Sequence, residues 1–300
     1  MNTKLFSELP TSVRIMEVGP RDGLQNEKKA LDADQRVGLI RALAAAGVKN
    51  IEVGSFVSPK WVPQMADTDT VVSKTGDIDA NLSVLVPNPR GMEQALVAEV
   101  KEIAVFTATS EAFCLKNTNC SVDESLERIK VVTEQALAAG MRVRGYVSTV
   151  LDCPYDGPMD AQRCADISKQ LIDMGCYEVS LGDTIGKGTP IRMAHLLETV
   201  MKQVPASQLA VHCHDTYGQA LANILVSLQM GISVVDSSVG GLGGCPYAKG
   251  ASGNVATEDV VFMLTEMGIE TGIDLSALNA IARDMSVLLD KPLPGHVHKA

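Results

Sequence analysis

Short apolar runs rich in β-branched residues alternate with longer amphipathic segments along most of the chain. Eight of these runs predict strands at 13–18, 50–53, 82–86, 102–107, 143–148, 177–181, 209–213 and 234–239. Between them, apolar residues at three- and four-residue spacing predict helices that include 33–46, 90–100, 122–139, 160–174, 189–204 and 217–230. Gly47, Gly140, Gly175 and Gly231 follow four of these helices, as expected for the left-handed residue that ends a helix.

The spacing of the strands predicts the fold class. They begin about every 31 residues, which is the length of one βα unit. Eight such units close a (β/α)8 TIM barrel, whereas a doubly wound sheet usually has fewer strands and often a GxGxxG turn, which does not follow residues 13–18. We therefore predict an α/β chain with a single domain over 1–300: a barrel at about 13–270 and a helical extension at about 271–300, with a helix at 273–289.

Composition narrows the class of protein. With 46% apolar and 21% charged residues, the 300-residue chain is typical of a globular protein. A formal net charge of −10 without a Lys/Arg run argues against nucleic acid as a partner, because phosphate binding needs a basic face. No apolar run approaches the roughly 20 residues of a membrane span, and the N-terminus lacks a signal-peptide core. Seven cysteines without a CxxC pair fit a reducing compartment, so we expect a cytoplasmic protein with no membrane partner.

Polar residues gather where four of the predicted strands end. They lie in the segments 17–25, 52–55, 182–184 and 211–215. Catalytic groups of a barrel come from the C-terminal ends of its strands and from the loops that follow. These four segments are therefore expected to meet at one mouth of the barrel.

The pair His212 and His214 is the sharpest local signal for a metal site. Alternate residues of a strand face the same side, so both imidazoles would point toward the barrel axis. Asp22 is a candidate third ligand from the end of the first strand. The alternatives are two hydrogen-bonded core histidines and a turn aspartate before Gly23. Mixed nitrogen and oxygen ligands suit Mg²⁺, Mn²⁺ or non-haem iron better than structural zinc.

A glycine-rich segment follows the eighth predicted strand. Residues 240–254 contain six glycines, which indicates a mobile lid or a close approach of the backbone to a ligand. The alternative is a flexible surface loop. Cys245 within it is a candidate proton donor or nucleophile, or simply a free thiol.

The positions of the lysines and of the other three histidines also bear on the possible chemistry. None of the predicted strands contains a lysine, which argues against a Schiff-base aldolase. Of the remaining histidines, His195 falls in a helical stretch. His296 and His298 belong to a C-terminal tail after the last predicted helix, and we expect both to be exposed because no predicted element holds them.

Several motifs together resemble the 3-hydroxy-3-methylglutaryl-CoA (HMG-CoA) lyase family of metal-dependent lyase and Claisen-synthase barrels, known as DRE-TIM metallolyases. They are GPRDGLQNE at 19–27, EVGSFVSPKWVPQM at 52–65, KNTNCS at 116–121, VHCHDTYGQ at 211–219 and the glycine-rich segment at 240–254. The resemblance covers nearly the whole chain, and the loop with its embedded cysteine is specific to the lyases. It implies a catalytic domain of the pyruvate carboxyltransferase-like type over 1–300.

The resemblance also implies the reaction and the cofactor. The family performs a divalent-metal-dependent retro-Claisen cleavage of (S)-3-hydroxy-3-methylglutaryl-CoA to acetoacetate and acetyl-CoA, the last step of leucine degradation and of ketone-body formation. A bound Mg²⁺ or Mn²⁺ would lower the pKa of the substrate hydroxyl. The implied metal ligands are Asp22, His212, His214 and Asn254.

Catalytic roles follow from the same resemblance. Arg21 would neutralise the developing enolate oxygen, oriented by Glu52. Asp183 or His212 is the implied base, and Cys245 the implied acid that protonates the enolate carbon. The implied substrate-binding residues are Arg21, Gln25 and Ser55.

The resemblance leaves some choices open. Animal members carry a mitochondrial leader and a C-terminal extension with a further cysteine, which this sequence lacks, so we expect a bacterial-type cytoplasmic enzyme and a non-covalent homodimer. One alternative is a lyase of a related 3-hydroxyacyl-CoA. Another is a Claisen-condensing synthase of the same superfamily, although such chains usually carry a long C-terminal region. A third is a metal-binding barrel that has lost catalysis.

Overall fold

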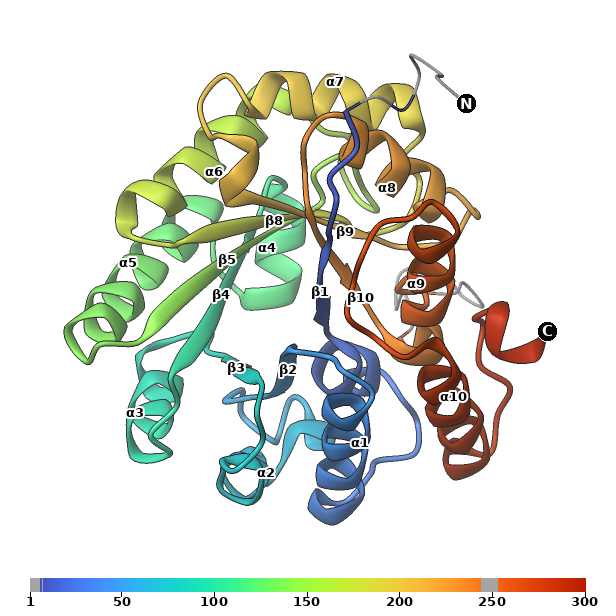
Figure 1. The fold of residues 1–300 in the computed structure, drawn as a ribbon. Coiled ribbons are helices and arrows are strands. Elements are labelled where there is room, and N and C mark those ends of the chain that lie inside the picture. Colours follow the sequence, from blue (N-terminus) through green and yellow to red (C-terminus); the bar gives the residue numbers. More distant parts are fainter. Residues whose placement is uncertain (1–5, 7, 244–252) are drawn as a thin grey trace.

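The structure, a computed structural model, describes residue 6, residues 8–243 and residues 253–300. Eight parallel strands close into a barrel in the order β1-β10-β9-β8-β5-β4-β3-β2, with helices around it (Figure 1). The strands are β1 (Arg14–Glu17), β2 (Asn50–Ser55), β3 (Asn81–Leu85), β4 (Glu102–Ala108), β5 (Arg142–Ser148), β8 (Glu178–Asp183), β9 (Leu209–Cys213) and β10 (Val234–Ser237). Each lies within two residues of its predicted bounds at either end. The predicted (β/α)8 barrel is therefore confirmed.

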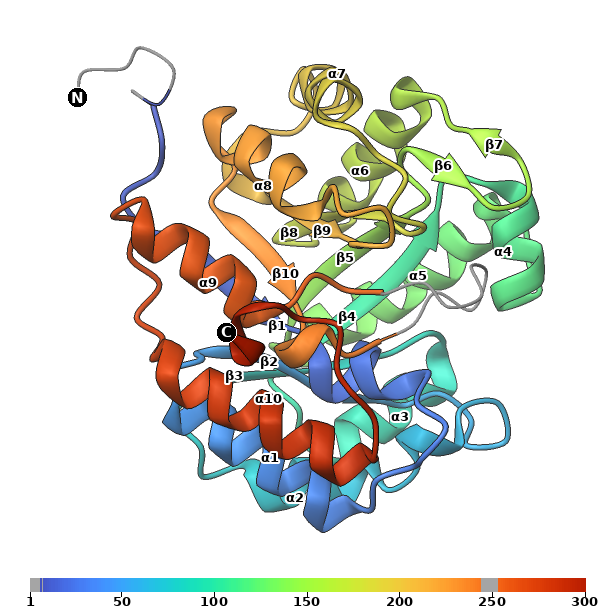
Figure 2. The ribbon, with the colours of Figure 1, turned by 90° about the vertical axis from the view of Figure 1, so that its right-hand side faces the viewer.

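Helices follow the strands and form the outer layer (Figures 1 and 2). They are α1 (Ala33–Ala45), α2 (Thr68–Thr75), α3 (Pro89–Val97), α4 (Glu111–Thr118), α5 (Val122–Ala138), α6 (Ala161–Met174), α7 (Pro190–Val200), α8 (Ala220–Gln229), α9 (Thr257–Glu266) and α10 (Leu275–Leu289). Short helical turns occupy η2 (Gly19–Gly23), η3 (Pro63–Met65), η4 (Ala206–Gln208), η5 (Val239–Gly241) and η6 (Val297–Lys299). A small antiparallel hairpin of β6 (Asp152–Cys153) and β7 (Gly157–Pro158) lies between β5 and α6 in sequence and was not predicted.

Local sequence signals explain where many of these helices begin and end. Side-chain oxygens cap several N-termini by accepting a backbone N–H of the first turn, at Asp32, Asn88, Ser110, Ser121, Asp160 and Asp274. The four glycines predicted to end helices all have positive φ: 96° at Gly47, 76° at Gly140, 110° at Gly175 and 90° at Gly231. These glycines confirm the predicted helix ends.

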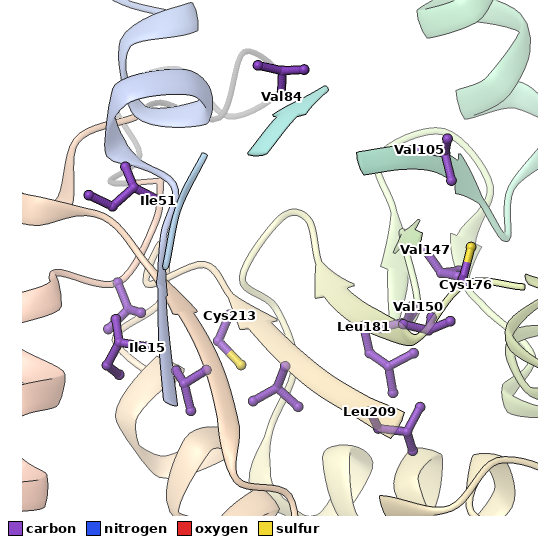
Figure 3. Packing of buried hydrophobic residues seen from close by; sticks show 14 of the residues in the cluster. Ile15, Ile51, Val84, Val105, Val147, Val150, Cys176, Leu181, Leu209 and Cys213 are labelled. Atoms are coloured by element: carbon purple, nitrogen blue, oxygen red, sulfur yellow. The ribbon is translucent and has the colours of Figure 1, made fainter. Parts of the chain in front are cut away.

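Side chains of the strands alternate between two environments. Outward-facing residues such as Ile15, Val84, Val105 and Leu181 belong to the large apolar cluster between barrel and helices (Figure 3). Within the barrel only a small apolar cluster is described, formed by Leu85, Ala104 and Tyr146 with Phe106 packed against it.

The barrel interior instead carries a charged network. Arg144 of β5 contacts Asp236 of β10, and these strands are separated by β8 and β9, so the contact crosses the interior. Most barrels fill this space with branched apolar residues. These charged residues indicate that side chains inside the barrel hold the polar groups at its mouth in position.

The predicted C-terminal helix is present as α10, which packs against α1 and α9. The tail after it is held more firmly than predicted. His296 is exposed, but its backbone and ring donate to Asp259. His298 is buried, with 6% of its surface exposed, and its Nδ1 lies 2.7 Å from Oε1 of Glu258. The prediction that His298 is exposed was wrong, because the acidic first turn of α9 supplies partners that the sequence pattern does not reveal.

Two further observations concern the class of protein. The six described cysteines are all free and buried, at 114, 120, 153, 164, 176 and 213. Among the described residues, no helix has both the length and the apolar character needed to cross a bilayer.

Candidate metal centre and active site

Arg21 and Asp22 lie in the turn η2 that follows β1. The turn fits closely against the loop after β10: a Cβ on Gly23 would lie 2.8 Å from both Ser238 Oγ and Leu242 Cβ. Glycine at this position therefore allows the two loops to touch. As a result, Arg21 and Asp22 are set beside the end of β10, one strand away from β9.

Asp22, His212 and His214 form the candidate metal centre. One ligand atom from each lies within 4.8 Å of the others, and His212 Nε2 is 4.0 Å from Asp22 Oδ2. Asn254 pairs with His214 in a short β-bridge and donates from Nδ2 to Asp22 Oδ2 at 2.9 Å and to the carbonyl of Leu242 at 3.1 Å. These bonds use the amide nitrogen, so Oδ1 is the Asn254 atom that a cation can use. The structure thus brings together all four residues expected as ligands.

The electrostatics of this cluster fit a divalent cation. Burial favours the neutral carboxyl, but Arg21, His212 and His214 outweigh it and lower the pKa of Asp22 to about 2. Burial lowers the pKa of His214 to about 4, so its imidazole is neutral and keeps a lone pair at neutral pH. Nδ1 of His214 is buried and has no hydrogen-bond partner among the described residues, a state that a role as metal ligand explains. In spite of burial, Asp236 and Asp22 raise the pKa of His212, so a cation bound there would replace the proton on Nε2. A carboxylate, two imidazole nitrogens and an amide oxygen form a donor set that Mg²⁺ and Mn²⁺ accept.

Asp236 of β10 orients the His212 ring through its Nδ1 atom. Its Oδ2 lies 3.3 Å from His212 Nδ1 and accepts from Ser180 Oγ at 2.7 Å, while Arg144 donates to both oxygens at 3.2 and 2.7 Å. Despite burial, Arg144 and His212 hold the pKa of Asp236 well below its usual range. Its carboxylate therefore accepts from Nδ1–H and directs the Nε2 lone pair of His212 toward Asp22.

Arg144 is itself fixed from a second side. Its Nε donates to Oε1 of Glu178 at 2.7 Å, so the guanidinium bridges two buried carboxylates. We did not predict Arg144, Glu178 or Asp236 as site residues. The signal was available, since charged residues alternate with apolar ones inside strands that are otherwise buried.

Arg21 is nearly buried and pinned by two carboxylates. Its Nε donates to Oε2 of Glu52 at 2.5 Å and its Nη1 to Oδ1 of Asp22 at 2.7 Å. Burial opposes the charge, but Glu52 and Asp22 raise the pKa of Arg21 further. The guanidinium also lies 5.8 Å from the ring of Tyr146. Within the described part of the chain Nη2 has no hydrogen-bond partner, so this nitrogen can donate to a substrate oxygen.

Asp183 lies at the end of β8 in a different setting. It is fully buried, and its Oδ2 accepts from the backbone N–H of Gly188 at 2.9 Å. Within the part of the chain that the structure describes, its Oδ1 has no hydrogen-bond partner. Burial raises the pKa of Asp183 to about 6. The strand register aligns Gly182 with His212 and Asp183 with Cys213, so by alternation Asp183 faces the helix layer rather than the His212 ring. Its described contacts are with the loop after β8.

For the remaining predicted site residues, the structure gives their position or burial but few contacts. Ser55 is buried at the end of β2, and none of residues 6, 8–243 and 253–300 forms a hydrogen bond with its hydroxyl. Gln25 is half-buried, three residues after Asp22. Cys245 lies outside the described residues, so its predicted role as proton donor stays a prediction.

Glu17 is a buried residue of this region to which we gave no role from sequence. Its carboxylate accepts from the backbone N–H groups of Gly19 and Val239 and from the hydroxyl of Thr257. It therefore ties the loops after β1 and β10 to the start of α9. Burial raises the pKa of Glu17 to about 7 in spite of these bonds.

Comparisons with known proteins agree on one family. Residues 12–285 match the family model described as HMGL-like. The chain is 56% identical over 279 residues to the mitochondrial hydroxymethylglutaryl-CoA lyase of Mus musculus, covering 93% of this chain and 86% of the mouse protein. It is 54% identical over 293 residues to the mitochondrial enzyme of Arabidopsis thaliana, covering 97% of this chain but only 63% of that longer protein.

Solved structures give the same picture. The crystal structure of hydroxymethylglutaryl-CoA lyase from Pseudomonas aeruginosa superposes with a TM-score of 0.94 at 52% identity, covering 97% of this chain and 98% of that one. An HMG-CoA lyase from Acinetobacter baumannii in complex with coenzyme A and 3-methylmalate superposes with a TM-score of 0.91 at 34% identity, covering 97% and 95% of the two chains.

Proposed function

The chain belongs to the HMGL-like family, as its motifs predicted, and from this premise we propose that it is a hydroxymethylglutaryl-CoA lyase. The reaction is cleavage of one carbon–carbon bond of (S)-3-hydroxy-3-methylglutaryl-CoA, which yields acetoacetate and acetyl-CoA. High identity over nearly the whole chain to proteins of that name supports this substrate. The neighbour that holds coenzyme A supports a CoA thioester. We further propose that residues 1–300 act as one catalytic domain, which the packing of α10 on α1 and α9 supports.

The metal centre is the observation that carries the proposal. Asp22, His212 and His214 converge at the mouth of the barrel, and Asn254 is bonded to Asp22. Held by these residues, Mg²⁺ or Mn²⁺ would supply Lewis-acid chemistry that makes the substrate hydroxyl more acidic. The rest of the chemistry falls to the side chains around it.

Arg21 is placed to stabilise the negative charge that develops when the bond breaks. Its guanidinium cannot swing away, because Glu52 and Asp22 hold Nε and Nη1. A fixed donor aimed at a developing oxyanion costs no reorganisation during the reaction, and such donors are worth about 3–4 kcal/mol of barrier. Glu52 is thus proposed as the residue that orients Arg21, and Arg21 as the residue that receives the enolate oxygen.

Two groups can serve as the base that takes the hydroxyl proton. His212 is at the centre, but its Nε2 lone pair serves either the cation or the proton at one time. Asp183 has a pKa near 6, suited to a base at neutral pH, although it faces the loop after β8. Asp183→Asn tests Asp183: residual turnover that has lost the acidic limb near pH 6 in the profile of kcat would support Asp183 as the base, and an unchanged limb would exclude it.

The remaining roles are proposals from the family. Cys245 would deliver a proton to the enolate carbon to give the methyl group of acetyl-CoA. Gln25 and Ser55 would contact the substrate with Arg21. A homodimer and a cytoplasmic location belong to the same group of proposals.

A coupled assay tests the function directly. Purified chain would be given HMG-CoA with Mg²⁺ or Mn²⁺, and release of acetyl-CoA and acetoacetate would be followed against an EDTA control. We expect both products in equal amounts, and none with EDTA. Cleavage of a related 3-hydroxyacyl-CoA but not of HMG-CoA would favour the alternative substrate, and condensation of acetyl-CoA with an oxo acid would favour a synthase.

A further inference from the structure

The C-terminal tail crosses the start of the loop that follows β10. The backbone N–H of Gly295 donates to the carbonyl of Gly240 at 3.0 Å. A Cβ on Gly240 would lie 2.3 Å from Leu293 Cδ1, and one on Gly241 would lie 2.9 Å from Pro294 Cγ. Both glycines have positive φ, near 67°, so the chain turns sharply where the tail lies on it. The tail and this turn therefore form one packed unit.

Glu258 joins the same two segments through its side chain. This carboxylate is fully buried at the start of α9. Its Oε2 accepts from the backbone N–H of Gly240 at 2.9 Å, and its Oε1 lies 2.7 Å from His298 Nδ1. His298 therefore holds the Glu258 carboxylate in place, and that carboxylate holds the turn at Gly240.

The turn leads directly to the metal centre. Leu242, one residue after the glycine pair, presents its carbonyl to Asn254 Nδ2 at 3.1 Å. The same nitrogen donates to Asp22 Oδ2 at 2.9 Å. A Cβ on Gly243 would lie 2.8 Å from that nitrogen, so the backbone there sits against the amide. A shift of the turn must therefore move the carbonyl that orients Asn254.

We propose that the C-terminal segment Leu293–His298 is a positioning element for the metal centre, acting through Glu258 and the Gly240–Gly241 turn on Asn254. The proposal rests on the proposed function of the centre as a divalent-metal site. It makes His298 a positioning residue, since its side chain pairs with Glu258 in the first turn of α9 and its backbone carbonyl with Arg283 of α10, rather than with the cluster itself.

The test compares variants of one tail in the full-length chain. His298→Ala removes the group that holds Glu258. His298→Asn puts an amide nitrogen close to the place of Nδ1 and should restore the bond. His296→Ala is the matched control, because His296 is exposed, lies two residues away and contacts Asp259 instead.

The readouts are Mn²⁺ affinity, measured by electron paramagnetic resonance of free Mn²⁺ with metal-free protein, and stability in urea. We expect His298→Ala to weaken Mn²⁺ binding by about tenfold, as second-layer substitutions do, with recovery in His298→Asn and wild-type affinity in His296→Ala. If His298→Ala proves too unstable, Gly295→Ala gives the same test, because its Cβ would lie 2.5 Å from Glu258 Oε1.

Two results would overturn the inference and can be told apart. Wild-type Mn²⁺ affinity in a destabilised but folded His298→Ala would show that the tail only stabilises α9, leaving the proposed function intact. Absence of Mn²⁺ binding in the wild-type chain would remove the metal site and the positioning role together.

Discussion

Replacing Asp236 by asparagine should show how strongly metal binding at the candidate centre depends on a residue that orients a ligand but is not itself a ligand. The carboxylate lies between Arg144, Ser180 and His212, fully buried. If the asparagine oxygen keeps the shorter bond to Arg144, its NH2 group faces His212 Nδ1. Nδ1 can then pair only by accepting, which moves the imidazole proton to Nε2, the atom that faces Asp22.

The size of each effect follows from these contacts. Breaking a buried charge pair from one side costs about 3–5 kcal/mol. Arg144 keeps Glu178 at 2.7 Å, so we expect about 3 kcal/mol at most, which leaves a typical domain folded. Loss of the correct tautomer should weaken Mn²⁺ binding by about 10–100-fold, or about 1.4–2.7 kcal/mol.

The assay pairs Mn²⁺ titration of metal-free protein with urea unfolding followed by circular dichroism. Ser180→Ala is the matched control, because it removes one hydrogen bond to the same oxygen but leaves the charge in place. That control should lose about 1 kcal/mol of stability and retain its Mn²⁺ affinity. A folded Asp236→Asn protein that binds Mn²⁺ within about twofold of wild type would refute the reasoning.

Three further predictions address the centre and its surroundings. Asp22→Asn and His214→Ala should each abolish Mn²⁺ binding and turnover while the far-ultraviolet spectrum is unchanged; turnover in either variant after metal removal would contradict the metal mechanism. Because burial raises the pKa of Glu17 from 4.5 to about 7, the native metal-free protein holds an extra proton on this residue in that range, so the Glu17 contribution to the unfolding free energy should fall as pH rises from about 4.5 to 7, by up to about 1.4 kcal/mol per pH unit. Glu17→Gln removes this contribution, so the slope of the unfolding free energy against pH, measured by urea unfolding across pH 5–7, should be more positive in the variant than in wild type, and an unchanged slope would show that Glu17 is ionised throughout. Cys245→Ala should slow turnover by about two or more decades with nearly unchanged binding of a CoA thioester, as expected for a lost proton donor, whereas a normal rate would make Cys245 a loop residue.

Much of the fold could be predicted because its signals are local. Each strand is a short apolar run and each helix a periodic segment, and four helices end at glycines whose positive φ only glycine adopts freely. The same locality explains the miss at the β6–β7 hairpin, where two-residue strands are too short to show a period. Repetition of one βα unit then determined the closed barrel.

The candidate metal ligands could be grouped from the sequence for a similar reason. His212 and His214 lie two residues apart, and Asp22 lies in the turn after the first strand, so strand alternation and the barrel mouth suffice to group them. The predicted roles of Asn254, Arg21 and Glu52 came from motifs that resemble a known family rather than from residue spacing.

What the sequence could not determine depends on contacts between residues far apart in the chain. Asp236 reaches His212 only because β9 and β10 are neighbours, and Arg144 reaches Asp236 only across the closed barrel. The burial of His298 likewise needs Glu258, 40 residues away, and no periodicity links them. The sequence by itself therefore determined the repeating units, the barrel and the grouping of the candidate metal ligands. Tertiary structure alone decided which buried charges hold those ligands in place, because a charge becomes a partner only where folding brings its counter-charge within bonding distance and excludes water.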